Sequence, residues 1–109
     1  MIAEELGRSL APTPFSSSVY LATEALISLG SNEQKQNYLP KLATGEIIGT
    51  LAHTESTSSP SIENLSCELN SNKLNGTKIA VTDGDIANFA VVSAKEGEKA
   101  VLCLSLIHI

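Results

Sequence analysis

The spacing of apolar residues changes from a helical to a strand-like pattern near residue 46. Before that point, Val19, Ala22, Leu26 and Leu29 recur every three or four residues, which is the spacing of one face of an α-helix. After it, apolar and β-branched residues form short runs separated by glycine, asparagine and aspartate, as in strands joined by tight turns. The order of the two patterns predicts an α+β protein in which a helical segment precedes a β-sheet.

Proline, serine and glycine mark the ends of two helices before residue 31. The first helix is expected over residues 2–10, and the prolines within residues 11–14 stop it because proline lacks an amide donor and restricts the residue before it. The serines at 16–18 offer N-cap oxygens to the second helix. Gly30 is expected to end that helix in the left-handed conformation.

A third helix is expected to follow at once. Ser31 and Gln34 have the spacing of a capping box, and Gly45 stands where a terminating glycine belongs. Pro40 should kink this helix or restart it, since a proline in a regular helix interior costs about 3 kcal/mol.

The second half of the chain predicts a series of short strands. They are expected at about residues 47–54, 66–70, 73–82, 87–94 and 100–104, with turns at Asn75-Gly76, Asp83-Gly84-Asp85 and Glu96-Gly97-Glu98. Such close spacing favours an antiparallel sheet or barrel. We expect residues 1–46 to be the C-terminal part of a helical domain and residues 47–103 to be part of a β-domain, because neither stretch is long enough to be complete.

The last six residues have a different character. Residues 104–109, LSLIHI, look like the translated end of a sequencing adaptor, and we expect them to lie outside the fold. His108 then has no function to explain. The alternative is that this segment is an apolar strand.

Composition excludes several classes of function. Seven basic and twelve acidic residues give a net charge of -5, and the basic residues are scattered, which disfavours nucleic-acid binding. Cys67 and Cys103 stand far apart without a histidine cluster, which disfavours a zinc site and a disulfide framework. The chain has no apolar run near the ~20 residues of a membrane-spanning helix.

The familiar nucleotide-binding and hydrolase motifs are absent. His53 and Thr54 are neighbours on a predicted strand and therefore face opposite ways, so a structural role is favoured for His53. The serine-rich run at 56–61 offers hydroxyls and amides to an anion, but a solvated connector is the favoured interpretation.

Two ordered blocks resemble the acyl-CoA dehydrogenase family. The first comprises EELGRSLAPTPF at 4–15, GSNEQK at 30–35 and YLPKLATGE at 38–46, and is similar to the end of that family's N-terminal helical domain, proline included. The second comprises Thr54-Glu55 and LNGTKIAVTDG at 74–84, and is similar to the middle β-domain that binds the flavin ring of FAD.

The resemblance implies a set of site residues. Thr54 and Thr82 match the family's flavin-contacting threonines, Leu51 and His53 lie on the strand that packs near the ring, and Ala80 stands where an aromatic residue often packs on it. By the same resemblance, Ser59 and Pro60 lie in the loop that contacts the substrate. No catalytic residue is expected in this chain, because the family's catalytic glutamate lies in a C-terminal helical domain.

The resemblance also implies an activity, partners and alternatives to them. The expected activity is FAD-dependent α,β-dehydrogenation of an acyl-CoA thioester, with electron-transfer flavoprotein as acceptor, in a homo- or hetero-tetramer of the bacterial cytoplasm or mitochondrial matrix. Ala80 and the altered loop at 56–61 favour instead a degenerate, non-catalytic subunit of a mixed complex. An acyl-CoA oxidase of the same fold is a third possibility.

Overall fold

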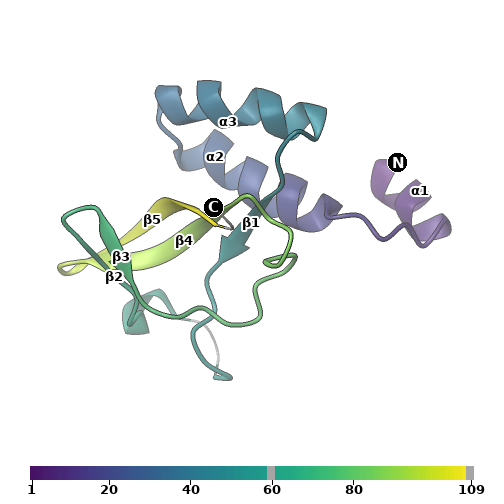
Figure 1. The fold of residues 1–109 in the computed structure, drawn as a ribbon. Helices are drawn as coiled ribbons and strands as arrows, with labels where there is room; N and C mark the ends of the chain where they lie inside the picture. Colours follow the sequence, from purple (N-terminus) through teal and green to yellow (C-terminus); the bar gives the residue numbers. More distant parts are fainter. Residues whose placement is uncertain (59–60, 108–109) are drawn as a thin grey trace.

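The structure is a computed structural model that describes residues 1–58 and 61–107. The helical segments come first: α1 Ile2–Arg8, the π-helix η1 Ser16–Thr23, α2 Glu24–Leu29 and α3 Asn32–Thr44. The strands follow: β1 Gly49–Ala52, β2 Glu68–Asn70, β3 Lys73–Asn75, β4 Phe89–Glu96 and β5 Lys99–Leu106, with the short 3₁₀ helix η2 Ile62–Asn64 before β2. Figure 1 shows α2 and α3 on one side of the sheet, with α1 set apart at the N-terminal end. The α+β expectation is confirmed.

The sheet is mixed, so the expectation of a purely antiparallel sheet needs correction. β5 pairs antiparallel with β4 along its whole length, and β3 pairs antiparallel with β2. β1 and β2 both run parallel to β4, and because β5 occupies one edge of β4, they share the other edge. The long connection from Ala52 to Phe89 returns the chain to the start of the sheet, which makes a parallel pair possible.

The first part of the C-terminal segment pairs with β4, which leaves its expected origin in a sequencing adaptor a prediction. Leu104 and Leu106 belong to β5, opposite Val91 and Phe89 of β4. The amide of Ile107 also donates to the carbonyl oxygen of Asn88 at 3.0 Å. Residues 104–106 are thus strand residues of β5 whatever their origin, and His108 and Ile109 lie outside the described residues.

The second predicted helix starts differently from the expectation. Phe15 precedes η1 with helical backbone angles, and the serines do not cap it. Ser17 instead lies within hydrogen-bond distance of the carboxylate of Asp83, at 2.5 Å. The predicted apolar stripe is confirmed at Ala22 and Leu26, which are buried, whereas Val19 and Leu29 at its two ends are exposed.

Gly30 follows α2 in an extended conformation (φ −69°, ψ 148°), so the left-handed cap predicted there is wrong. A Cβ at this position would lie 2.5 Å from the carbonyl oxygen of Leu26. Close backbone approach, and not a positive φ, is the reason that glycine fits here.

The predicted limits of α3 are confirmed. Ser31 and Gln34 form the capping box, and Gly45 ends the helix with φ 75°. The helix continues through Pro40 and does not restart there. Gln36, whose carbonyl oxygen loses its usual amide partner to this proline, is exposed, so water can replace the lost donor.

The segment after β2 departs most from the predicted strand at 73–82. Strand pairing ends at Asn75, and the hairpin turn lies at Ser71-Asn72, both of which have positive φ, instead of at Asn75-Gly76. The remainder runs as irregular chain with Ala80 in the left-handed region. The turns predicted near Asp83 and Gly97 are present.

The sheet has a buried cluster on each face. Phe89 and Val91 of β4 pack against Ala22 and Leu26 on the helix side, where Tyr38 also contacts the ring of Phe89. Alternate residues of β4 join Ala52 and Cys67 in the cluster on the opposite face. The period of two along β4 therefore divides the core between the two faces.

We expect Gly49→Ala to lower the free energy of unfolding by about 1–3 kcal/mol, because the added methyl group overpacks the helix side of the sheet. Its Cβ would lie 2.6 Å from Cζ of Phe89 and 2.7 Å from Cβ of Ala22. Urea denaturation of the variant measures the change. Gly7→Ala is the control: its Cβ meets nothing within 4 Å in α1, so that variant should be as stable as the original or more so. Equal stability of the two variants would contradict the prediction.

Candidate functional site

The residues that the sequence suggested for cofactor binding lie at the end and the outer edge of β1. The amide of Ile79 donates to the carbonyl oxygen of Thr54 at 2.8 Å, and the hydroxyl of Thr50 donates to that of Thr82 at 2.6 Å. Residues 79–82 therefore run antiparallel alongside β1. Thr54 and Thr82 lie near opposite ends of a strip roughly 13 Å long, at about 3.3 Å per residue. We call Thr54, Ala80 and Thr82 the threonine strip.

The structure divides the suggested residues between two places. The side chain of Leu51 packs with the helix-side cluster, and His53 lines a hollow on that same side. Thr54 and Thr82 belong to the threonine strip instead. Ser59 and Pro60, which were suggested for substrate binding, lie outside the described residues.

The hydroxyl groups of Thr54 and Thr82 have no hydrogen-bond partner within residues 1–58 and 61–107. Thr54 is half-buried and Thr82 is exposed. Two free hydroxyls on one strip suit a planar ligand with several acceptor atoms, which is the chemistry of a flavin ring. Ala80 is exposed with φ 51° and offers a methyl group, so the strip has no aromatic side chain at that position.

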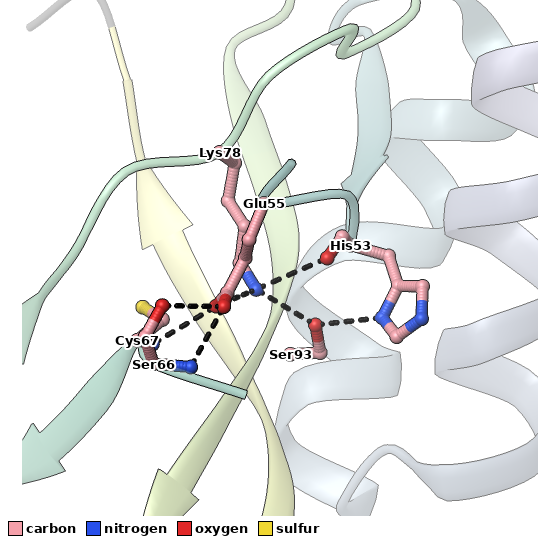
Figure 2. Close-up of polar contacts among 6 residues, drawn as sticks. All are labelled: His53, Glu55, Ser66, Cys67, Lys78 and Ser93. Carbon is pink, nitrogen blue, oxygen red and sulfur yellow. Dashed lines mark hydrogen bonds and ion pairs between the residues drawn. The ribbon is translucent and has the colours of Figure 1, made fainter. Parts of the chain in front are cut away.

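A buried ion pair, which the sequence reasoning missed, lies next to this strip. Figure 2 shows Lys78 reaching Glu55, with Nζ and Oε1 2.8 Å apart. The side chains of Lys78 and Glu55 are only 8% and 13% exposed. The two residues lie 23 positions apart, and no local pattern marks either as a partner of the other.

Glu55 also binds the start of β2. Its carboxylate accepts hydrogen bonds from the amide and the hydroxyl of Ser66, at 2.7 and 2.6 Å, and from the amide of Cys67, at 2.9 Å. Burial by itself raises the pKa of Glu55, but the hydrogen bonds from Lys78, Ser66 and Cys67 outweigh that effect and lower the pKa from 4.5 to about 2. Glu55 is therefore a structural anion and not a candidate base.

Lys78 uses its other two donors on the residue that follows β1 and on a residue of β4. Its ammonium group donates to the carbonyl oxygen of His53 at 3.2 Å and to the hydroxyl oxygen of Ser93 at 3.0 Å. Ser93 is in turn 2.8 Å from Nδ1 of His53. His53 is thus hydrogen-bonded in the way expected of a structural histidine, and Figure 2 shows its other ring nitrogen turned away from this network.

Burial also acts on the two thiols. It raises the pKa of Cys67, where Lys78 opposes and Glu55 adds to the effect. It raises the pKa of Cys103 too, with smaller contributions from Cys67 and Glu96. Neither residue is therefore set up as a reactive thiolate.

Within the described part of the chain, no group of three metal-binding side chains comes together. No helix there is long and apolar enough to cross a membrane. In the described part of the serine run, the hydroxyls of Ser56 and Ser58 bond to each other at 2.6 Å in an exposed loop.

Comparison with known proteins links the fold to one family. Residues 1–46 match the family described as acyl-CoA dehydrogenase, N-terminal domain. The chain is 35% identical over 98 residues to isovaleryl-CoA dehydrogenase from Solanum tuberosum, covering 84% of this chain and 24% of that protein. It is 34% identical over 109 residues to the Pongo abelii enzyme of the same name, covering 93% and 25%. The chain spans about a quarter of the length of these relatives.

Solved structures give the same result. A glutaryl-CoA dehydrogenase from Mycobacterium smegmatis in complex with FADH2 superposes with a TM-score of 0.75 at 29% identity, covering 85% of this chain and 25% of that one. The ChsE4-ChsE5 complex from Mycobacterium tuberculosis gives a TM-score of 0.79 at 28% identity, covering 94% and 28%.

We expect Glu55→Gln to remove a contribution to the free energy of unfolding that is present at neutral pH and lost at acidic pH. The pKa of Glu55 is depressed in the folded state, so its contribution is fully present above about pH 4.5 and is lost as the pH falls towards 2. The contribution at neutral pH is on the order of 3 kcal/mol. Urea denaturation between pH 2 and 7 should show the two proteins converging at the acidic end. The control is Glu63→Gln, an exposed position, whose stability should follow that of the original protein at every pH. If the stability of Glu55→Gln ran parallel to that of the original protein down to pH 2, Glu55 would not be the stabilising anion.

Lys78→Met should destabilise the protein by about 3–5 kcal/mol, because it leaves the buried carboxylate of Glu55 without its counter-charge. The comparison is Lys99→Met, which removes an exposed ammonium group at the start of β5 and should change stability by less than about 1 kcal/mol. Thermal melting of both variants measures the difference. A similar small effect in both would show that the ion pair contributes little.

Proposed function

We propose, because this chain belongs to the acyl-CoA dehydrogenase family, that it forms part of the FAD site of an enzyme that oxidises acyl-CoA thioesters to enoyl-CoA products. The threonine strip carries the proposal: it offers two hydroxyls that have no hydrogen-bond partner among the described residues. FAD, when bound, supplies the hydride acceptor for this reaction. The FADH2 complex of the glutaryl-CoA dehydrogenase that superposes on this chain supports the choice of cofactor.

The residues of this chain orient the ring and adjust its electronic properties. Hydroxyl donors at Thr54 and Thr82 would stabilise negative charge on a flavin ring bound beside them. The backbone of Leu51 and His53, at and just after β1, is proposed to lie near the same ring. Ser59 and Pro60 are proposed to contact the substrate, as their place in the sequence implies.

The rest of the proposed activity belongs to the whole protein. We place the catalytic glutamate outside residues 1–109, and we propose electron-transfer flavoprotein as the electron acceptor and a homo- or hetero-tetramer as the assembly. The bacterial cytoplasm or the mitochondrial matrix is the proposed location; relatives are named as mitochondrial enzymes, and another is an acyl-CoA dehydrogenase from Bacillus subtilis.

A second candidate is a non-catalytic subunit of a mixed complex. The observation that favours it is the exposed methyl group of Ala80 on the threonine strip, which offers little surface for the ring to stack on. The ChsE4-ChsE5 neighbour, which is a complex of two proteins, agrees with such an assembly. Bound FAD in the purified full-length protein would exclude this candidate.

We expect the full-length protein to bind FAD and to show a flavin absorbance spectrum. Thr54→Ala and Thr82→Ala should each weaken FAD binding about fivefold, the equivalent of one hydrogen bond of about 1 kcal/mol. Titration of the apoprotein with FAD, followed by flavin fluorescence, measures the affinities. Thr77→Ala, an exposed threonine on the same segment, is the matched control and should bind like the original. A colourless protein, or equal affinities in all the variants, would overturn the proposal.

A further inference from the structure

The charged residues at the two ends of the segment 79–82 differ in whether a counter-charge meets them. Lys78 comes just before the segment, and its ammonium group is paired with the carboxylate of Glu55 at 2.8 Å. Asp83 comes just after it, and in the described part of the chain no basic side chain forms an ion pair with it. The charges of Lys78 and Glu55 cancel, so the threonine strip is left beside the negative charge of Asp83.

Hydrogen bonds hold Asp83 in one place. Its carbonyl oxygen accepts from the amides of Ile86 and Ala87, at 3.1 and 3.0 Å, and its carboxylate lies 2.5 Å from Oγ of Ser17. Ser17 is fully buried in η1, and its other contact, to the carbonyl oxygen of Pro14, is longer at 3.1 Å. A hydroxyl group that donates to a carboxylate makes a strong hydrogen bond but leaves the charge in place.

Asp83 lies next to Thr82, one of the two free hydroxyl groups of the strip. Consecutive Cα atoms are about 3.8 Å apart, so an atom that contacts Thr82 is roughly 5–10 Å from the carboxylate, which is no more than the screening length at moderate salt. Asp83 is half-buried, so solvent screens its charge less than that of an exposed residue. The charge therefore acts on whatever binds to the strip.

A fixed negative charge distinguishes the two oxidation states of a flavin. Transfer of a hydride to the ring adds two electrons and one proton, so the ring gains one negative charge. A neighbouring carboxylate repels that charge, whereas it has little effect on the neutral oxidised ring.

We propose that Asp83 adjusts the redox equilibrium of the flavin site by favouring oxidised over reduced FAD, with Ser17 holding the carboxylate in place. This inference rests on the proposed FAD site and adds to it a residue that sets its redox behaviour. By linkage, removal of the charge strengthens the binding of reduced FAD relative to oxidised FAD. Repulsion between two unit charges at this separation corresponds to about a fivefold change in relative affinity.

The test measures the affinity of the full-length protein for FAD twice, once oxidised and once reduced by dithionite without oxygen. Ultrafiltration separates bound from free flavin, and the result is the ratio of the Kd for reduced FAD to the Kd for oxidised FAD. Asp83→Asn removes the charge, while its side-chain oxygen can still accept from Ser17, and should lower this ratio about fivefold. Asp83→Ser also removes the charge and should lower the ratio similarly, so the test does not depend on the folding of one variant.

Two matched variants separate the charge of Asp83 from other effects. Asp83→Glu keeps the charge and should keep the ratio. Asp85→Asn removes an exposed acidic residue two positions along and should change the ratio less than about twofold, because solvent screens that charge.

The outcomes distinguish this inference from the proposed function. If Asp83→Asn weakens both affinities by the same factor, or leaves both unchanged, Asp83 does not adjust the redox equilibrium, while FAD binding by the protein stands. If the original protein binds FAD in neither oxidation state, the proposed function and this inference are both wrong.

Discussion

The sheet depends on the buried ion pair between Glu55 and Lys78. β1 and β2 both pair with the same edge of β4, and between them the strand ladder is interrupted at Ser93. The amides of Ser66 and Cys67 lie at this interruption, and the carboxylate of Glu55 accepts both of them. Lys78 neutralises that carboxylate and bonds to β4 through Ser93. A buried charge is tolerated here because every one of its close partners is a donor or a counter-charge.

The same ion pair connects the threonine strip to the hollow that His53 lines. Lys78 belongs to the segment that continues to Ala80 and Thr82, so holding its side chain also holds the threonine strip against β1. Through Ser93 it orients the ring of His53 on the helix side of the sheet. The ammonium group of Lys78 thus positions both the threonine strip at the outer edge of β1 and the ring of His53 at the hollow. Substitution of Lys78 should therefore alter both places.

Close packing beside the network sets the position of the helices. Gly49 at the start of β1 lets Ala22 and Phe89 approach the strand, and η1 contacts the segment of Thr82 through Ser17 and Asp83. These contacts therefore fix the positions of η1, β1 and the threonine strip relative to one another. The fold shared with acyl-CoA dehydrogenases over 85% of the chain is the scaffold, while His53 and Ala80 are features of this chain that bear on what it binds.

The sequence by itself determined the features that depend on local chemistry. The helix-to-strand order, the capping box at Ser31, the left-handed Gly45 and the turn at Gly97 all follow from neighbours within a few residues. Tertiary structure decided the rest, because the deciding contacts join residues far apart in the chain. Strand direction, the extended conformation of Gly30 and the pairing of Glu55 with Lys78 all depend on such contacts. A periodic pattern shows which face of an element is apolar, but it does not show which distant side chain will meet a buried charge.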